Sequence, residues 1–158
     1  MKNKTTLNII LFISIVALGS AYFIEYILDY KPCNLCLLAR LPYLFAIIII
    51  LILLTINKFY KIFFILLTVT FAVGTILSFY HFGIEQGFFN ESLVCVTNNE
   101  IDTLSKDDLI KELQKKVISC KDVQFTFLGL SLALINTIIS FILSVITLKH
   151  FLNYEKNK

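Results

Sequence analysis

Four long apolar runs constrain the fold of this chain more than any other feature of its sequence. They extend over residues 7–27, 37–56, 62–80 and 125–148. A bilayer core is crossed by about 20 helical residues, so each run is long enough to span a membrane. Hydrophobic residues make up 58% of the chain and charged residues 16%, a composition that excludes intrinsic disorder and gives a soluble domain of 158 residues nowhere to bury its apolar surface. The sequence predicts an all-α membrane protein in which residues 1–158 form one four-transmembrane-helix bundle.

Very few charges interrupt the runs. Glu25 and Arg40 are the only ones, and the sequence assigns no role to Glu25. The net charge of +3 belongs mostly to lysines at the expected membrane edges, which leaves no basic face for nucleic acid. The first run follows two lysines, as a signal peptide does, but it continues well past the small residues at Ala17 and Gly19, so we expect a retained span.

The distribution of lysine predicts the orientation of the bundle. With four spans, the termini and the loop between the second and third runs share one side, which carries seven lysines (Lys2, Lys4, Lys58, Lys61, Lys149, Lys156 and Lys158). Positive residues in short loops favour the cytoplasm. We therefore expect a bacterial inner-membrane protein with cytoplasmic termini, and with periplasmic loops at about residues 28–36 and 81–124.

All four cysteines then lie on the oxidising side of the membrane, where three pairings are possible. Cys33 and Cys36 form a CxxC motif at the start of the second run, a spacing that suits an easily reduced disulfide. A helix start there, with Arg40 one turn further on, would favour the thiolate of Cys36. Pro42 leaves the exact start of that helix open, since proline belongs in a first turn or at a kink.

Cys95 and Cys120 lie in the long polar loop between the third and fourth runs. Between them, Ser105 and the acidic residues after it resemble a helix N-terminus. The residues that follow place Leu109, Ile110, Leu113 and Val117 on one face. The sequence therefore predicts a short amphipathic helix that can lie on the membrane surface and hold the second cysteine pair near the first.

Other interpretations of these residues stay open at this point. The two cysteine pairs could be plain structural disulfides in a non-catalytic membrane protein, and an enzyme with reversed electron flow would be a reductase. Arg40 could extend to the interface, and His81 could be an ordinary interfacial histidine. A metal site made of the CxxC, His81 and a further cysteine is chemically possible. Because exposed thiols on this side tend to be oxidised, we expect no resident metal.

Three segments resemble the disulfide bond formation protein B (DsbB) family. The stretch 30–40, YKPCNLCLLAR, is similar to the K-P-C-x-L-C-x-x-x-R segment of that family. The stretch 80–87, YHFGIEQG, is similar to the YHxGVExG block that precedes the third cysteine of the family. The CKD at 120–122, with FLGLS at 127–131, resembles the block before the last helix.

The resemblance implies a membrane oxidase that reoxidises a periplasmic thioredoxin-like dithiol oxidase (DsbA-like) and passes the electrons to a membrane quinone. By position, Cys33 and Cys36 match the quinone-facing pair, and Cys36 matches the cysteine whose thiolate contacts the quinone. Cys95 matches the cysteine that forms the mixed disulfide with the partner, and Cys120 matches its resolving mate. Arg40 and His81 match residues beside the quinone. The sequence does not distinguish ubiquinone from menaquinone, and it assigns no role to Glu85.

Overall fold

Four long helices make up most of the molecule. The computed structural model describes residues 2–56, 60–90, 95, 120, 126–127 and 129–156. Its elements in chain order are α1 (Lys2–Tyr26), α2 (Asn34–Leu38), α3 (Leu41–Ile56), α4 (Tyr60–Glu85), β1 (Thr126–Phe127), β2 (Leu130–Ser131) and α6 (Leu132–Lys156). Within this described part, four helical segments are long and apolar enough to cross a membrane, α2 and α3 together counting as one. The predicted four-helix membrane bundle is confirmed.

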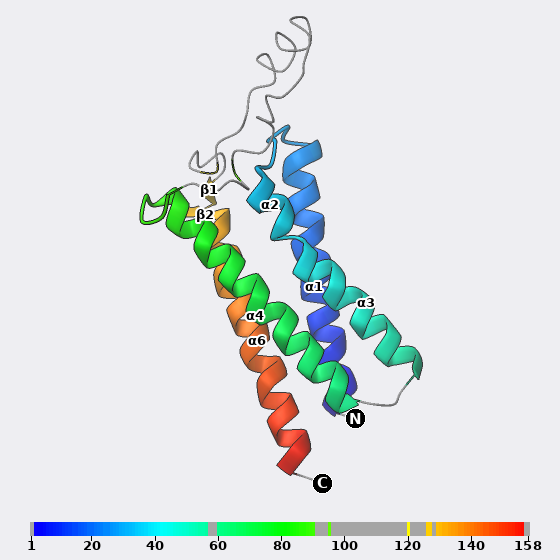
Figure 1. The fold of residues 1–158 in the computed structure, drawn as a ribbon. Coiled ribbons are helices and arrows are strands. Elements are labelled where there is room, and N and C mark those ends of the chain that lie inside the picture. Colours follow the sequence, from blue (N-terminus) through cyan, green and yellow to red (C-terminus); the bar gives the residue numbers. More distant parts are fainter. Residues whose placement is uncertain are drawn as a thin grey trace, which may run out of the picture.

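The helices run roughly along one common direction (Figure 1). Helix α4 packs mainly against α6, and α3 contacts both α4 and α1. Both termini lie at one end of the bundle, whereas α2 and the β1–β2 pair lie at the other end (Figure 1). The described cysteines lie at this second end, so all of them are at the end of the bundle opposite the termini.

The bundle has an apolar outside, as a protein surrounded by lipid requires. Phe12, Ile76 and Phe141 are 68%, 67% and 59% exposed. Such surface would be costly in water, but it costs nothing against hydrocarbon. Large apolar residues such as Phe64 and Phe71 also fill the interior, where they pack alongside small polar residues (Ser14, Ser78, Ser140 and Thr147) that are fully buried. Small and hydroxyl-bearing residues are typical of close helix contacts in membranes.

Hydrogen bonds between helices join α3, α4 and α6 in the core. The Tyr43 hydroxyl donates to Asn136 Oδ1 at 2.5 Å and lies 3.0 Å from Ser140 Oγ. Asn136 Nδ2 donates to Ser78 Oγ at 2.6 Å. Close to this network, a Cβ added at Gly74 would meet Pro42 at 3.1 Å, so a side chain at position 74 would push α3 and α4 apart.

We expect replacement of Asn136 by leucine to destabilise the bundle. Leucine cannot pair with Tyr43 or Ser78, and each interhelical hydrogen bond in a membrane contributes about 0.6 to 2 kcal/mol. The expected loss is about 1–3 kcal/mol, measured as the shift in the free energy of unfolding in mixed detergent micelles. Ile138→Leu, on the exposed side of the same helix, is the control and should leave stability unchanged.

Pro42 explains why the second span is divided into α2 and α3. Proline has no N–H, so it cannot donate to the carbonyl of Leu38, and its ring would clash with that carbonyl. Accordingly α2 ends at Leu38, and α3 begins at Leu41 with Pro42 in its first turn. The CxxC therefore belongs to a separate short helix rather than to the mouth of one continuous span.

Two other boundaries differ from the apolar runs. Helix α4 continues to Glu85, so His81 and Glu85 are helical residues rather than loop residues. Helix α6 begins at Leu132 rather than near position 125, because β1 and β2 form a small antiparallel pair just before it. Gly129, between the two strands, has a φ of +80°, a conformation that glycine adopts without strain.

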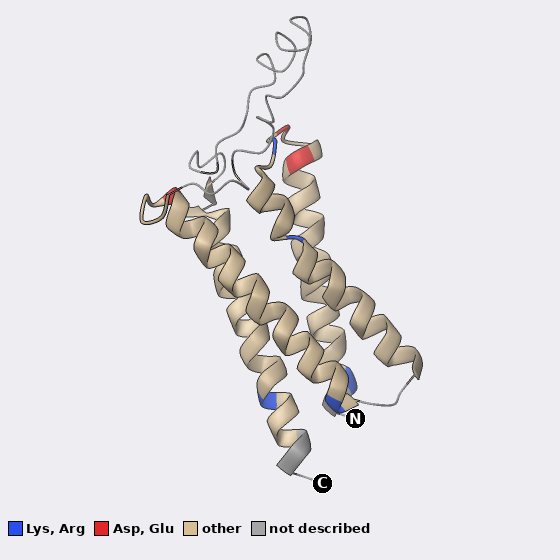
Figure 2. Cartoon of the chain, in the orientation of Figure 1, with Lys and Arg blue, Asp and Glu red and all other residues tan. Residues whose placement is uncertain are grey.

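Most described charged residues lie near the two ends of the bundle, and Arg40 lies at the break between α2 and α3. Lys4 and Lys61 are near the starts of α1 and α4, and Lys149 is in the last third of α6. Figure 2 shows Lys and Arg (blue) at the end that holds the termini and Asp and Glu (red) near the opposite end. The amphipathic helix predicted after Ser105 lies outside the described residues.

Candidate functional site

The CxxC motif lies on α2, at the end of the bundle opposite the termini. Cys33 is the N-cap of α2, and its sulfur accepts a hydrogen bond from the backbone N–H of Cys36 at 3.3 Å. Both cysteines are free thiols, and their Sγ atoms lie 2.8 Å apart. Cys33 is buried, whereas Cys36 is half-buried. One turn of helix thus positions both sulfurs together and supplies a hydrogen-bond donor to the first of them.

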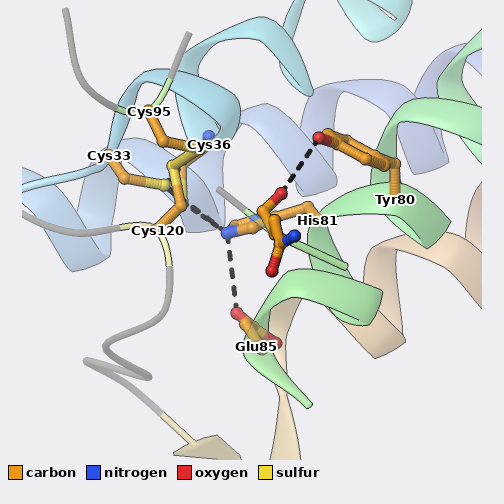
Figure 3. The surroundings of a disulfide bond; sticks show 8 residues. Cys33, Cys36, Tyr80, His81, Glu85, Cys95 and Cys120 are labelled. Carbon is orange, nitrogen blue, oxygen red and sulfur yellow. Dashed lines mark hydrogen bonds and ion pairs between the residues drawn. A yellow bond between two sulfur atoms is a disulfide. The ribbon is translucent and has the colours of Figure 1, made fainter. Parts of the chain in front are cut away.

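Helix α4 brings a histidine and a carboxylate to the same sulfurs. His81 Nε2 lies 3.5 Å from Cys33 Sγ, 4.0 Å from Cys36 Sγ and 3.7 Å from Glu85 Oε1 (Figure 3). The His81 and Glu85 side chains are each 7% exposed. Among the buried side-chain oxygen and nitrogen atoms of the described residues, Glu85 Oε2 lacks a hydrogen-bond partner. His81, which can accept or donate a proton, therefore contacts both sulfurs of the CxxC directly.

The second cysteine pair lies against the first. Cys95 and Cys120 form a disulfide with a Cα–Cα distance of 5.7 Å, within the usual range for such bonds. They are 2% and 1% exposed, and they belong to one buried cluster with Cys33, Leu35 and Ile84, against which Cys36 packs (Figure 3). All four sulfurs of the chain therefore meet at one place, although they come from three separate segments.

A cavity of about 200 Å³ adjoins the CxxC. Its walls come from five helices (α1, α2, α3, α4 and α6) and the segment before α2, and they are mainly apolar. Its polar and sulfur-bearing lining residues are Ser20, Glu25, Tyr30, Lys31, Cys33, Cys36, Arg40, Tyr43, His81, Glu85 and Asn136. Four of the six site residues predicted from the sequence line this cavity: Cys33, Cys36, Arg40 and His81. The other two, Cys95 and Cys120, form the loop disulfide that packs against Cys33 in its wall.

Arg40 is held by partners on α1 rather than by the cysteines. Its guanidinium forms an ion pair with Glu25, and it lies 5.0 Å from the centre of the Tyr22 ring. The Arg40 and Glu25 side chains are 13% and 22% exposed. This pair orients Arg40 along the cavity wall and fastens the break between α2 and α3 to α1. Glu25, to which the sequence assigned no role, is thus part of the site.

In the reduced CxxC pair, Cys33 is the thiol that ionises more easily. The hydrogen bond from the Cys36 side chain and the nearby His81 together lower the pKa of the Cys33 thiol to about 4, against the opposing effect of burial. This differs from the expectation that a helix start and Arg40 would favour the thiolate of Cys36. The physical reason is that the Cys36 side chain and His81 act on Cys33, whereas Arg40 is paired with Glu25.

We expect the alkylation of Cys33 in the reduced protein to depend little on pH above about 5. A thiol with an ordinary pKa of about 8.5 loses reactivity about tenfold per pH unit below that value. A pKa of about 4 keeps Cys33 as the thiolate down to that pH, and its reactivity should fall only as the pH drops through it. Iodoacetamide labelling read by mass spectrometry measures this. A tenfold loss between pH 7 and pH 6, as in the denatured chain, would contradict it.

Comparison with known protein families decides what kind of protein carries this site. The sequence model of the family described as "Disulfide bond formation protein DsbB" matches residues 3–149. The chain belongs to the DsbB family. The match spans all four long helices and all four cysteines, so this DsbB-family protein is a disulfide bond formation protein of the membrane.

A similar protein is found in Rickettsia prowazekii (strain Madrid E). It is described as "Uncharacterized protein RP370" and is 36% identical to this DsbB-family chain over 142 residues, which cover 88% of this chain and 83% of the other. Its description adds no activity. The functional argument therefore depends on the family and on the site itself.

Sequence reasoning missed two members of this DsbB-family site. Glu25 was the only acid within the first apolar run, and an ionisable residue inside a span is by default a candidate for function, so this signal was available. Glu85 lies four residues after His81, the spacing that places two side chains on one helix face. This spacing is informative only if both residues are helical, and the apolar run, which ends at position 80, did not indicate that α4 continues to Glu85.

Proposed function

We propose that this protein is a thiol:quinone oxidoreductase that reoxidises a periplasmic DsbA-like dithiol oxidase and passes the electrons to a membrane quinone. The observation that carries the proposal is the contact between the two cysteine pairs. A redox-spaced CxxC and a loop disulfide share one buried cluster, and the CxxC also lines a cavity between the helices. Plain structural bridges would have no need for either arrangement.

The first step is an exchange at the loop disulfide. A thiolate of the reduced partner attacks Cys95, the Cys95–Cys120 bond breaks, and Cys120 leaves as a thiolate. The second thiol of the partner then attacks the mixed disulfide, so the partner departs oxidised and Cys95 is released as a thiolate. The partner has lost two electrons, and the loop cysteines have gained them.

The second step moves the two electrons to the CxxC. The Cys120 thiolate attacks Cys33 of a Cys33–Cys36 disulfide, and Cys36 leaves as a thiolate. Cys95 then attacks Cys120, which re-forms the loop disulfide and frees Cys33. While Cys33 is bonded to Cys120 it carries no charge, so the thiolate lies on Cys36, the sulfur that is half-buried beside the cavity. His81, within reach of both sulfurs, takes or returns the proton.

The cavity fits the head group of a quinone. Sites for drug-sized ligands are about 300–1,000 Å³, so a cavity of about 200 Å³ suits a single ring with its tail in the lipid. Arg40 and His81 supply hydrogen-bond donors for ring oxygens, and the unpaired Glu85 Oε2 is a buried acceptor in the same wall. A bound quinone, whether ubiquinone or menaquinone, would accept two electrons and two protons there.

We expect Arg40→His to weaken the apparent affinity for quinone more than it slows thiol exchange. A hydrogen bond from a charged donor contributes about 1.5–3 kcal/mol, so the KM for quinone should rise by about 10-fold or more. The rate of mixed-disulfide formation with the partner should change by less than about threefold, because Arg40 does not contact the sulfurs. Stopped-flow measurements of the two reactions in purified protein test this. An equal fall in both rates would contradict it.

We also propose that the cysteine-bearing end faces the periplasm of a bacterial inner membrane. The lysines near the termini support a cytoplasmic position for the opposite end. Thiol exchange with a periplasmic partner requires this orientation. Labelling of cysteines introduced at Thr55 and Phe89, near the two ends, with a membrane-impermeant maleimide tests it: only the second should react in intact spheroplasts.

A redox titration separates this proposal from a purely structural role for the bridges. Structural disulfides in secreted proteins have potentials below about −300 mV, whereas a relay must exchange with an oxidase near about −120 mV. We expect both bridges to be reduced far above −300 mV when the purified protein is equilibrated with glutathione buffers and the free thiols are trapped. Resistance of both bridges in every glutathione buffer would overturn the proposed function.

A further inference from the structure

The sulfurs of the CxxC and the imidazole of His81 form a cluster that has the composition of a metal site. In the described part of the chain, Cys33 Sγ, Cys36 Sγ and a ring nitrogen of His81 all lie within 4.8 Å of one another. Two thiolates and one imidazole are ligands that Zn²⁺ prefers, and two cysteines separated by two residues are a usual half of a zinc site. In the proposed relay His81 moves a proton, and the same ring nitrogen, within reach of both sulfurs, can serve as a third metal ligand.

The distances between the donor atoms are close to those of a tetrahedral site. With Zn–S near 2.3 Å and Zn–N near 2.05 Å, tetrahedral geometry puts sulfur and nitrogen about 3.6 Å apart and two sulfurs about 3.8 Å apart. His81 Nε2 lies 3.5 Å from Cys33 Sγ and 4.0 Å from Cys36 Sγ. The two sulfurs lie 2.8 Å apart, so a rotation that separates them by about 1 Å completes the geometry.

Glu85 lies beside the imidazole of His81, outside the cluster of three donor groups. Its Oε1 is 3.7 Å from His81 Nε2, close to the nitrogen–oxygen spacing of about 3.4 Å in a tetrahedral zinc site. Its other oxygen, Oε2, is buried without a hydrogen-bond partner. The cavity is lined by all four residues and so provides an entry path for an ion. A buried acceptor with no partner beside three metal ligands is an independent indication of a cationic guest.

We infer that the reduced protein binds one divalent cation of the Zn²⁺ class through Cys33, Cys36 and His81, with the carboxylate of Glu85 beside the histidine ligand. The disulfide form cannot bind it, because thiolates are the ligands and a disulfide has none. The site therefore exists only in one redox state. Bound metal keeps the two sulfurs apart and their electron pairs occupied, so it prevents them from re-forming the disulfide.

The binding step involves no change of oxidation state. The cation gains two bonds from sulfur and one from the neutral imidazole, and any proton still on the two thiols is released to solvent. Loss of the metal returns the free dithiol. No oxidant or reductant is consumed, and the inhibition is reversed by a chelator.

Cobalt titration tests the site directly. The Cys95→Ser/Cys120→Ser double variant retains only the two CxxC cysteines, so every thiol that binds metal is one of the pair. After reduction and removal of the reductant, we expect Co²⁺ to bind with 1:1 stoichiometry and to give sulfur-to-metal charge-transfer and tetrahedral d–d absorption bands. Zn²⁺ should displace it. The oxidised form of the same variant should show no bands.

Single substitutions test the assigned ligands. His81→Ala should weaken binding at least about 100-fold and Glu85→Gln about 10-fold, as expected for a ligand and for a group beside it. The control is His150→Ala, which removes the other histidine of the chain, on α6. It should leave the affinity and the spectrum unchanged. Equal binding by the oxidised form, or unchanged binding in His81→Ala, would overturn the inference.

A chemical oxidant tests the consequence independently of any quinone. Diamide should close the Cys33–Cys36 bond in the metal-free reduced variant, and one equivalent of Zn²⁺ should slow this closure at least about 10-fold, with full recovery after addition of a chelator. Closure at the same rate with and without Zn²⁺ would show that the metal does not block the pair. Neither result depends on whether the protein reduces quinones.

Discussion

Cys36→Ser is expected to abolish the quinone-dependent oxidation of a dithiol partner, by at least about a thousandfold. A serine hydroxyl can neither form a disulfide with Cys33 nor leave as a thiolate, so no electron pair reaches the cavity. Loss of an essential covalent group reduces turnover by factors of this size or more. Serine is slightly smaller than cysteine, so it fits the half-buried position of Cys36 without disturbing its neighbours. Anaerobic reduction of added quinone by reduced partner, followed by absorbance, measures the effect.

The same experiment contains its own spectroscopic check. If the Cys36 thiolate lies against the quinone, the protein with bound quinone should show a visible thiolate–quinone absorption band when Cys33 is trapped in a mixed disulfide, and Cys36→Ser should remove it. Ser20→Ala, in the same cavity wall but with its hydroxyl bonded to Ala17 O on its own helix, is the matched control. It should retain both the band and turnover. Quinone reduction at the normal rate in Cys36→Ser would refute the assignment.

Cys95→Ser is expected to abolish turnover with a protein dithiol and to spare turnover with a small one. Without Cys95 there is no loop disulfide for the partner to attack. The Cys33–Cys36 bond remains, and its half-buried member lies on a cavity that a small dithiol can reach. We expect a loss of at least about a thousandfold with the protein partner but less than about tenfold with dithiothreitol. Full activity with the protein partner would show that Cys95 is not the partner-facing cysteine.

Cys120→Ser is the matched control, because it removes the same bridge. Loss of a disulfide across 25 positions removes about 3.5 kcal/mol of loop restraint in either variant, so a difference between them cannot come from stability. In Cys120→Ser the free Cys95 should capture the oxidised partner as a mixed disulfide, seen as a band of higher mass on a non-reducing gel. Cys95→Ser should capture none. Exposure does not separate the two sulfurs, since both are buried, so this experiment decides their roles.

The membrane fold was predictable because it depends on local properties of the chain. A span needs only length and apolarity, and each of the four runs has both, so the long helices follow from composition along the sequence. The division at Pro42 was visible as an ambiguity, since the missing N–H of proline allows either a first turn or a kink. The end of α4 was not predictable from hydropathy. Its last turn carries polar residues that are stable there because they are buried among the cysteines.

The members of the site were largely visible in the sequence, but their geometry was not. Cysteine, histidine and arginine are rare enough in this chain to be singled out, and the CxxC spacing is itself a chemical signal. The ion pair between Arg40 and Glu25 could not be predicted in this way, because Glu25 lies on another helix. Many ways of packing two helix faces together are compatible with the same apolar pattern. The argument that Arg40 favours a thiolate on Cys36 assumed that Arg40 was free to act on the sulfurs, whereas in the structure it is paired with Glu25.

By itself, the sequence determined that this protein has four spans, that its cysteines gather at one end, and which residues are candidates for its chemistry. Those properties follow from hydropathy and spacing, which are local. Only the tertiary structure decided that the loop disulfide touches the CxxC, that His81 reaches both sulfurs, and that Glu25 holds Arg40. Such contacts join segments up to tens of residues apart, and they are set by how the helices pack and rotate against one another, which no local pattern specifies.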